Sequence, residues 1–188
     1  EGTGKALGAM LQNVSMFRPS FIEAQPAAAA FTANLVQGLD KIGIGFDTST
    51  GLLDDFTKVF RKSPREAGKS VKKLVKIADS LGKSAGQVAQ DFSQALPQIA
   101  QFGGRAIEVF AELEAQSVAT GLSVNDLAGF AKGLDTFQGA AKAAQGLNAA
   151  LGGTFVSVTD LVHADPAEKI TIMHDAMDRA GVSFEDAD

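Results

Sequence analysis

One short pattern, Gly-x-Ser-x-x-(Gln or Asp), occurs three times in the chain and limits what the chain can fold into. Its copies are GKSAGQV at 82–88, GLSVNDL at 121–127 and GVSFEDA at 181–187. A glycine just past a helix end adopts the left-handed conformation at little cost, and a serine two residues later caps the next helix. An acid or amide three residues after the serine completes a capping box. The pattern predicts three helix–turn–helix junctions, with these cap residues: Ser84, Gln87, Ser123, Asp126, Ser183 and Asp186.

Two further segments carry an even fuller helix-start signal. SPRE at 63–66 and DPAE at 165–168 each combine a cap residue, a proline at the first helical position and a glutamate three residues after the cap. We expect each to form a reciprocal capping box, through these pairs: Ser63 with Glu66, and Asp165 with Glu168.

The first copy of the repeated pattern also matches G-x-S-x-G, the turn that exposes a nucleophilic serine in some hydrolases. That turn follows a buried strand. The residues before Gly82 instead place apolar side chains at helical spacing, namely Val71, Leu74, Val75, Ala78 and Leu81. We therefore interpret Ser84 as a helix cap.

Helical stripes separated by glycine or proline account for most of the chain. The expected helices are 5–17, 27–42, 52–62, 64–81, one from 85 that breaks or kinks before Pro97, then 105–119, 124–134, 137–151 and 166–180. Only the β-branched run at 154–162 favours a strand. We predict an all-α fold without a substantial sheet, arranged as a folded-back helical array or a segmented coiled coil. Residues 1–62 form an N-terminal helical segment and 63–188 a second helical region.

The amino-acid composition excludes two kinds of stabilising site. The chain has no cysteine, which leaves no disulfide and no thiolate zinc site, and it has 13 Phe but neither Tyr nor Trp. It begins at Glu1 without an initiator Met and stops at Asp188 just after a helix start. We expect it to be part of a longer protein.

Charge is unevenly distributed along the chain. Between Lys58 and Lys83 there are nine basic residues and two acidic ones, whereas from Arg105 to Asp188 there are five basic and thirteen acidic residues. On the helix predicted at 64–81, four lysines lie opposite the apolar stripe: Lys69, Lys72, Lys73 and Lys76. They form either a solvated helix face or an interaction face for phosphate or an acidic protein wall.

Candidates for catalysis or metal binding are sparse. His163 and His174 are the only histidines, and their spacing to Asp165, Glu168, Asp175 and Asp178 matches no familiar metal motif. No carboxylate pair suggests acid–base chemistry. We predict no enzyme activity, no cofactor, no metal and no catalytic residue.

One ordered series of blocks resembles a known family. LDTFQGAAKAAQGLNAALGG at 134–153 is similar to a segment of tape measure proteins from tailed bacteriophages, and the flanking 102–130 and 165–186 resemble the same family. The likeness covers about residues 80–188. The residues that match the block are Asp135, Thr136, Phe137, Gly139, Leu147, Asn148, Leu151 and Gly152.

This resemblance implies a structural virion protein in the lumen of the phage tail, made in the bacterial cytoplasm. Such a protein sets tail length, nucleates tube assembly and takes part in DNA ejection. The implied partners are copies of itself as a trimer or hexamer, the tail tube and baseplate hub proteins, and DNA during ejection. Contact with the host membrane is implied through parts of the protein outside this sequence.

Glycine and proline interrupt the helical pattern of this chain frequently. A long measuring rod would instead need a continuous helix with an uninterrupted heptad seam. We expect helices that fold back on one another. Two other classes of protein stay open: a cellular all-helical scaffold or adaptor without enzymatic activity, and a catalytic domain in which His163 or His174 meets a carboxylate cluster in a pocket.

Overall fold

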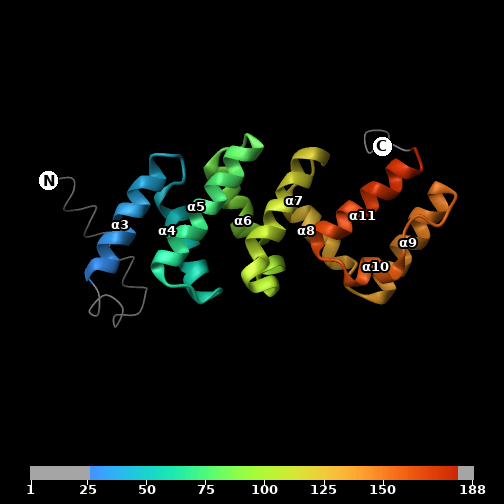
Figure 1. The fold of residues 1–188 in the computed structure, drawn as a ribbon, viewed down its shortest axis with the longest axis horizontal. Coiled ribbons are helices and arrows are strands. Elements are labelled where there is room, and N and C mark those ends of the chain that lie inside the picture. The colour runs from blue at the N-terminus through green and yellow to red at the C-terminus, as the bar shows by residue number, and fades with distance from the viewer. Residues whose placement is uncertain (1–25, 182–188) are drawn as a thin grey trace. The chain divides into compact units, whose positions relative to one another are not determined.

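The computed structural model describes residues 26–181, and every regular element within that range is a helix (Figure 1). The predicted all-α fold is confirmed. None of these helices combines the length and apolarity needed to cross a membrane. The helix expected at 5–17 and the caps Ser183 and Asp186 lie outside the described residues.

The chain divides into two compact units, Glu1–Ser93 and Gln94–Asp188. The boundary expected from the sequence, at residues 62 and 63, instead lies inside the first unit, in the turn between two helices that pack on each other. The observed division falls within a helix, a position that no change in composition marks.

The first unit contains α3 (Pro26–Asp40), α4 (Phe46–Lys58), α5 (Pro64–Leu81) and the beginning of α6 (Ala85–Ile99). Helices α3, α4 and α5 pack against one another in all three pairs. The ring of Phe56 on α4 stacks on that of Phe92 on α6, with centroids 5.1 Å apart. The buried apolar side chains of this unit are Val36, Leu39, Ile44, Leu52, Leu53, Phe56, Ala67, Val71, Leu74, Ala78, Val88, Ala89 and Phe92.

The second unit contains the end of α6, a 3₁₀ helix η1 (Ala100–Arg105), α7 (Ala106–Thr120), α8 (Val124–Gly133), α9 (Phe137–Leu151), α10 (Val158–His163) and α11 (Pro166–Arg179). Helix α11 returns to pack on both α7 and α8, while α10 packs on α9. One apolar cluster of this unit consists of Leu134, Ala140, Ala144, Val156, Leu161 and Ala176. Within each unit the helices fold back on their neighbours.

Three expectations from the sequence were wrong: two about helix ends and one about a strand. Helix α4 begins at Phe46 rather than at 52, with Gly51 inside the helix, and it ends at Lys58 before Arg61 takes a left-handed φ of 52°. Helix α6 continues through Pro97 and ends two residues later, at Ile99, so the proline does not break the helix before it.

The third concerns residues 154–162. Residues 154–157 form a connection, and the rest of the run is α10, which Ser157 caps by accepting from the N–H of Asp160 at 3.4 Å. A local cap thus overrides the β preference of branched residues.

Candidate interaction surfaces

Four of the five predicted cap pairs lie within the described residues. Reciprocal capping boxes form at α5, between Ser63 and Glu66, and at α11, between Asp165 and Glu168. At the other two helix starts the serine hydroxyl accepts from the helix: Ser84 Oγ from the Gln87 N–H at 3.2 Å, and Ser123 Oγ from the Asp126 N–H at 3.1 Å. The capping box expected of Asp126 does not form, because its carboxylate accepts from the Ser123 hydroxyl at 2.6 Å instead of from the Ser123 N–H.

The glycines of the G-x-S-x-G match have packing roles. Gly82 is the left-handed C-cap of α5, with φ of 67°. A Cβ on Gly86 would lie 2.4 Å from the carbonyl oxygen of Gly43, so only glycine lets α6 approach the turn after α3 this closely. A helix, not a strand, precedes Ser84, and the nucleophile interpretation therefore has no structural basis.

The four lysines of α5 are all exposed, but their surroundings divide them into two pairs. Lys69 lies near Glu66, whose pKa is lowered by hydrogen bonds from Ser63 and further by the charges of Lys62 and Lys69. Lys73 lies near Lys62, whose pKa is lowered by burial and by the charge of Lys73.

Lys72 and Lys76 instead line an open groove between α3 and α5. The groove has a volume of about 540 Å³, and its lining is Phe31, Asn34, Leu35, Gly38, Leu39, Ile42, Lys72, Val75 and Lys76. At its end the two helices meet closely, since a Cβ on Gly68 would lie 2.7 Å from the side chain of Leu35. We call this surface the α3–α5 groove.

The block that carries the family resemblance folds as α9 and its two flanking turns. Thr136 caps the helix by accepting from the N–H of Gly139 at 3.0 Å, and Gly152 ends it with φ of 72°. A Cβ on Gly139 would lie 2.0 Å from the carbonyl oxygen of Gly133, so this position admits only glycine without movement of the turn. Leu147 and Leu151 are partly buried against the apolar cluster, and Phe137 is 70% exposed.

Asn148 fastens the chain that follows α9. Its Oδ1 accepts from the N–H groups of Phe155 and Val156, both at 2.8 Å, and its Nδ2 donates to the carbonyl of Val156 at 2.9 Å. This amide takes the place of a neighbouring strand for residues 155 and 156, and it seats Val156 in the apolar cluster.

Asp135, the first matching residue of the block, forms an ion pair with Lys169 of α11. Lys169 is 1% exposed, and its ammonium also donates to the carbonyl of Ala131 at 3.4 Å. On the same helix, Asp165 is 6% exposed and pairs with Arg105 at 3.0 Å. The buried charges of α11 are therefore matched by groups from η1 and from the turn before α9.

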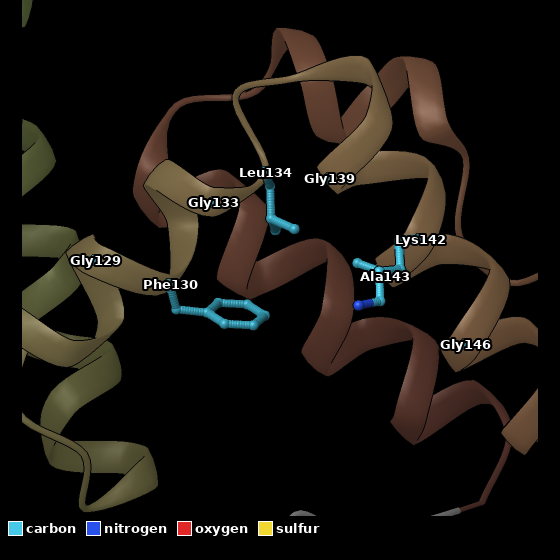
Figure 2. A pocket seen from close by; sticks show the side chains of 8 residues that line it. All are labelled: Gly129, Phe130, Gly133, Leu134, Gly139, Lys142, Ala143 and Gly146. Atoms are coloured by element: carbon cyan, nitrogen blue, oxygen red, sulfur yellow. The ribbon is translucent and has the colours of Figure 1, made fainter.

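A second open groove, of about 490 Å³, runs between α8 and α9 (Figure 2). It is almost entirely apolar, and Figure 2 shows the side chains of Phe130 and Lys142 on its two sides. Its lining is Gly129, Phe130, Gly133, Leu134, Gly139, Lys142, Ala143 and Gly146. The glycines expose helix backbone, which allows an apolar side chain to approach closely.

The two histidines have different contacts and do not share a site. His163 Nδ1 lies 2.8 Å from the carbonyl of Thr159. His174 pairs with Asp178 at 3.2 Å, and with Asp175 these three could place ligand atoms within 4.8 Å of one another. All three sit on one outward helix face, an arrangement that is ordinary without a metal, and we assign none.

Sequence reasoning missed both grooves and the buried Lys169. The grooves depend on which helices pair, and no local pattern records that pairing. Glycines spaced four apart, as at Gly129 and Gly133, were the available signal for the second groove. Comparisons with protein-family models, with curated proteins and with solved structures each found no match.

Proposed function

We propose that this chain is a folded segment of a tape measure protein from a tailed bacteriophage. The observation that carries the proposal is the block at 134–153. Its distinctive residues act together in one packing unit, in which Thr136 starts α9, Gly139 permits the tight turn, Asn148 fastens the following chain and Gly152 ends the helix. Residues with such roles suit a structural protein, and their ordered likeness to the phage family points to the tail.

In this proposal the protein lies in the lumen of the tail, self-associates as a trimer or hexamer, and contacts the tube and the baseplate hub. It sets tail length, nucleates tube assembly and accompanies DNA at ejection. The folded-back helices within each unit favour a compact portion of the protein over the extended rod that measures length.

Two measurements on the phage that encodes the chain test the proposal. Mass spectrometry of purified tails should detect the chain, and antibodies raised against residues 26–181 should label tails only after the tube is opened. If the chain is absent from purified tails and remains with cellular proteins, it is a helical scaffold or adaptor of the cell, and the phage proposal is wrong.

An in-frame deletion of residues 84–122 tests the folded portion separately. As continuous helix, roughly 39 residues at 1.5 Å each would shorten the tail by about 60 Å. Because the deletion removes α6, η1 and α7 entirely, it exposes apolar surface that they cover, and we expect failed assembly. Uniform tails shorter by about 60 Å in electron micrographs would show that this region is extended tape.

A further inference from the structure

The α3–α5 groove combines an apolar trough with positive charge on one side only. Phe31 and Leu35 from α3, Ile42 from the turn after α3 and Val75 from α5 supply its apolar surface, and Ile42 is 48% exposed. An exposed isoleucine beside a half-buried phenylalanine and leucine is apolar surface that the first unit does not cover with its own described residues.

The two sides of the groove differ in charge. On α5 its edge is formed by Lys72 and Lys76, one helical turn apart, and on α3 by Asn34 and Gly38. No atom lies within 4 Å of a Cβ built on Gly38, so no side chain blocks the groove at this position of α3. The groove is therefore accessible along its length and offers cations on a single flank.

We propose that this groove binds an amphipathic helix of a partner protein, with acidic residues along the flank that faces α5. Such a helix places apolar side chains at i, i+3, i+4 and i+7 in the trough, and acids one turn apart opposite Lys72 and Lys76. The inference stands on the groove alone and does not depend on the phage assignment.

A nucleic acid fits the groove less well. Phosphates would reach Lys72 and Lys76 but would lie against the apolar side chains of Ile42 and Val75, where they lose hydration without gaining hydrogen bonds. The trough favours a ligand that is apolar on one face, and an acidic amphipathic helix has that face.

The test uses the full 188-residue chain and a fluorescein-labelled peptide of 18 residues, with leucines at helical spacing on one face and glutamates along one flank. Fluorescence polarisation at 150 mM salt measures binding. A peptide with the same composition in scrambled order and one with lysines in place of the glutamates are the controls. We expect the acidic amphipathic peptide alone to bind.

A matched pair of charge variants locates the site. Lys72→Glu/Lys76→Glu should weaken binding of the acidic peptide at least about tenfold, because attraction becomes repulsion at the groove edge. Lys69→Glu/Lys73→Glu changes the same charge on the same helix but away from the lining, and should weaken binding no more than about threefold. The lysine-flanked peptide should bind the Lys72→Glu/Lys76→Glu variant.

The apolar trough is tested by a second matched pair. Ile42→Ser should weaken binding, whereas Val59→Ser, which alters a residue of similar exposure outside the groove, should leave it unchanged. Gly38→Leu fills the groove and favours helix formation, so this variant should be at least as stable as the natural chain and yet fail to bind.

Several results would overturn the proposal. Equal losses for the two lysine double variants would reduce the interaction to general charge attraction, and tighter binding of a single-stranded oligonucleotide would make the site a nucleic-acid surface. Displacement of the probe by a peptide of residues 1–25 would assign the groove to the chain itself. A shift of the full chain from monomer to oligomer that Gly38→Leu abolishes would assign it to a second copy.

Discussion

The side-chain amide of Asn148 forms two hydrogen bonds with the backbone of Val156, donating to its carbonyl at 2.9 Å and accepting from its N–H at 2.8 Å. The amide thus meets both backbone hydrogen-bonding groups of a residue eight positions away, as the backbone of a neighbouring strand would. The pairing holds Val156 in the apolar cluster between α9, α10 and α11, and it makes the second unit sensitive to a single amide.

Replacing Asn148 by alanine should lower the free energy of unfolding by about 2 to 4 kcal/mol, because three hydrogen bonds of about 1 kcal/mol each are lost and two N–H groups lose their acceptor. Urea denaturation followed by circular dichroism measures the change. Asn125→Ala, at an exposed position of α8, should change stability by less than about 0.5 kcal/mol. Equal losses of stability in the two variants would show that the hydrogen bonds of Asn148 to residues 155 and 156 do not stabilise the fold.

Two glycines of α9 should respond to alanine in opposite directions. Gly146 has no atom within 4 Å of a built Cβ, so Gly146→Ala should stabilise the helix by about 0.5 to 1 kcal/mol. Gly139→Ala places a methyl group 2.0 Å from the carbonyl oxygen of Gly133 and should destabilise the protein by about 1 to 3 kcal/mol. Thermal melting of both variants decides; a stabilising Gly139→Ala would contradict the close approach.

Removing a cap hydroxyl should cost stability without abolishing any reaction. Ser84→Ala and Ser123→Ala should each cost about 0.5 to 2 kcal/mol, since each removes an acceptor for a helix N–H. Ser80→Ala, which alters a serine in the last turn of α5, serves as the control and should cost less than the cap variants. A hydrolytic activity that disappears in Ser84→Ala with unchanged melting would revive the nucleophile hypothesis.

The ion pair of Asp135 with Lys169 should show strong coupling. Asp135→Ala leaves a buried ammonium with one long bond to Ala131 and should cost about 1 to 3 kcal/mol. In the Lys169→Met background the same change should cost little, because the buried charge is gone. A double-mutant cycle in urea measures the difference; additive effects would mean that the pair is fully solvated.

The capping box of α5 should weaken in acid. Hydrogen bonds from Ser63 lower the pKa of Glu66 below its usual value of 4.5, so the folded state binds the proton less tightly than the unfolded state. Its contribution is present above pH 4.5 and is lost as the pH falls through the lowered pKa. Urea denaturation between pH 7 and pH 3 should show the stability difference between the natural chain and Glu66→Gln shrinking over that window. In a Ser63→Ala background the dependence should be smaller; an unchanged dependence would contradict the proposed cause.

The sequence predicted the parts of the fold that depend on nearest neighbours along the chain. A cap joins residues three apart, so Ser63 with Glu66 and Asp165 with Glu168 can be read from spacing alone. The side chain of Asn148 instead bonds to backbone atoms of residues 155 and 156. Every residue type has these backbone atoms, so the contact leaves no pattern in the sequence. The same holds for Gly139, whose requirement comes from the carbonyl of Gly133.

The α3–α5 groove could not be predicted for a related reason. Lys69, Lys72, Lys73 and Lys76 share one outward arc of α5, and hydrophobic periodicity treats them alike. Only the position of α3 separates Lys72 and Lys76 from the other two. The burial of Lys169 could not be predicted for another reason. A lysine is expected to be exposed, and its partner Asp135 lies in a turn that is distant in the sequence.

The order of helix pairing also bears on how quickly each unit forms. In the first unit α3, α4 and α5 pack on one another with at most one helix between partners along the chain. Short loops therefore close first, and the core can form early, while later residues are still being synthesised. In the second unit α11 must return to α7 and α8, some 50 residues upstream, before Lys169 meets its acceptors. The first unit is therefore expected to complete its folding during translation, and the second only after residues 166–179 leave the ribosome.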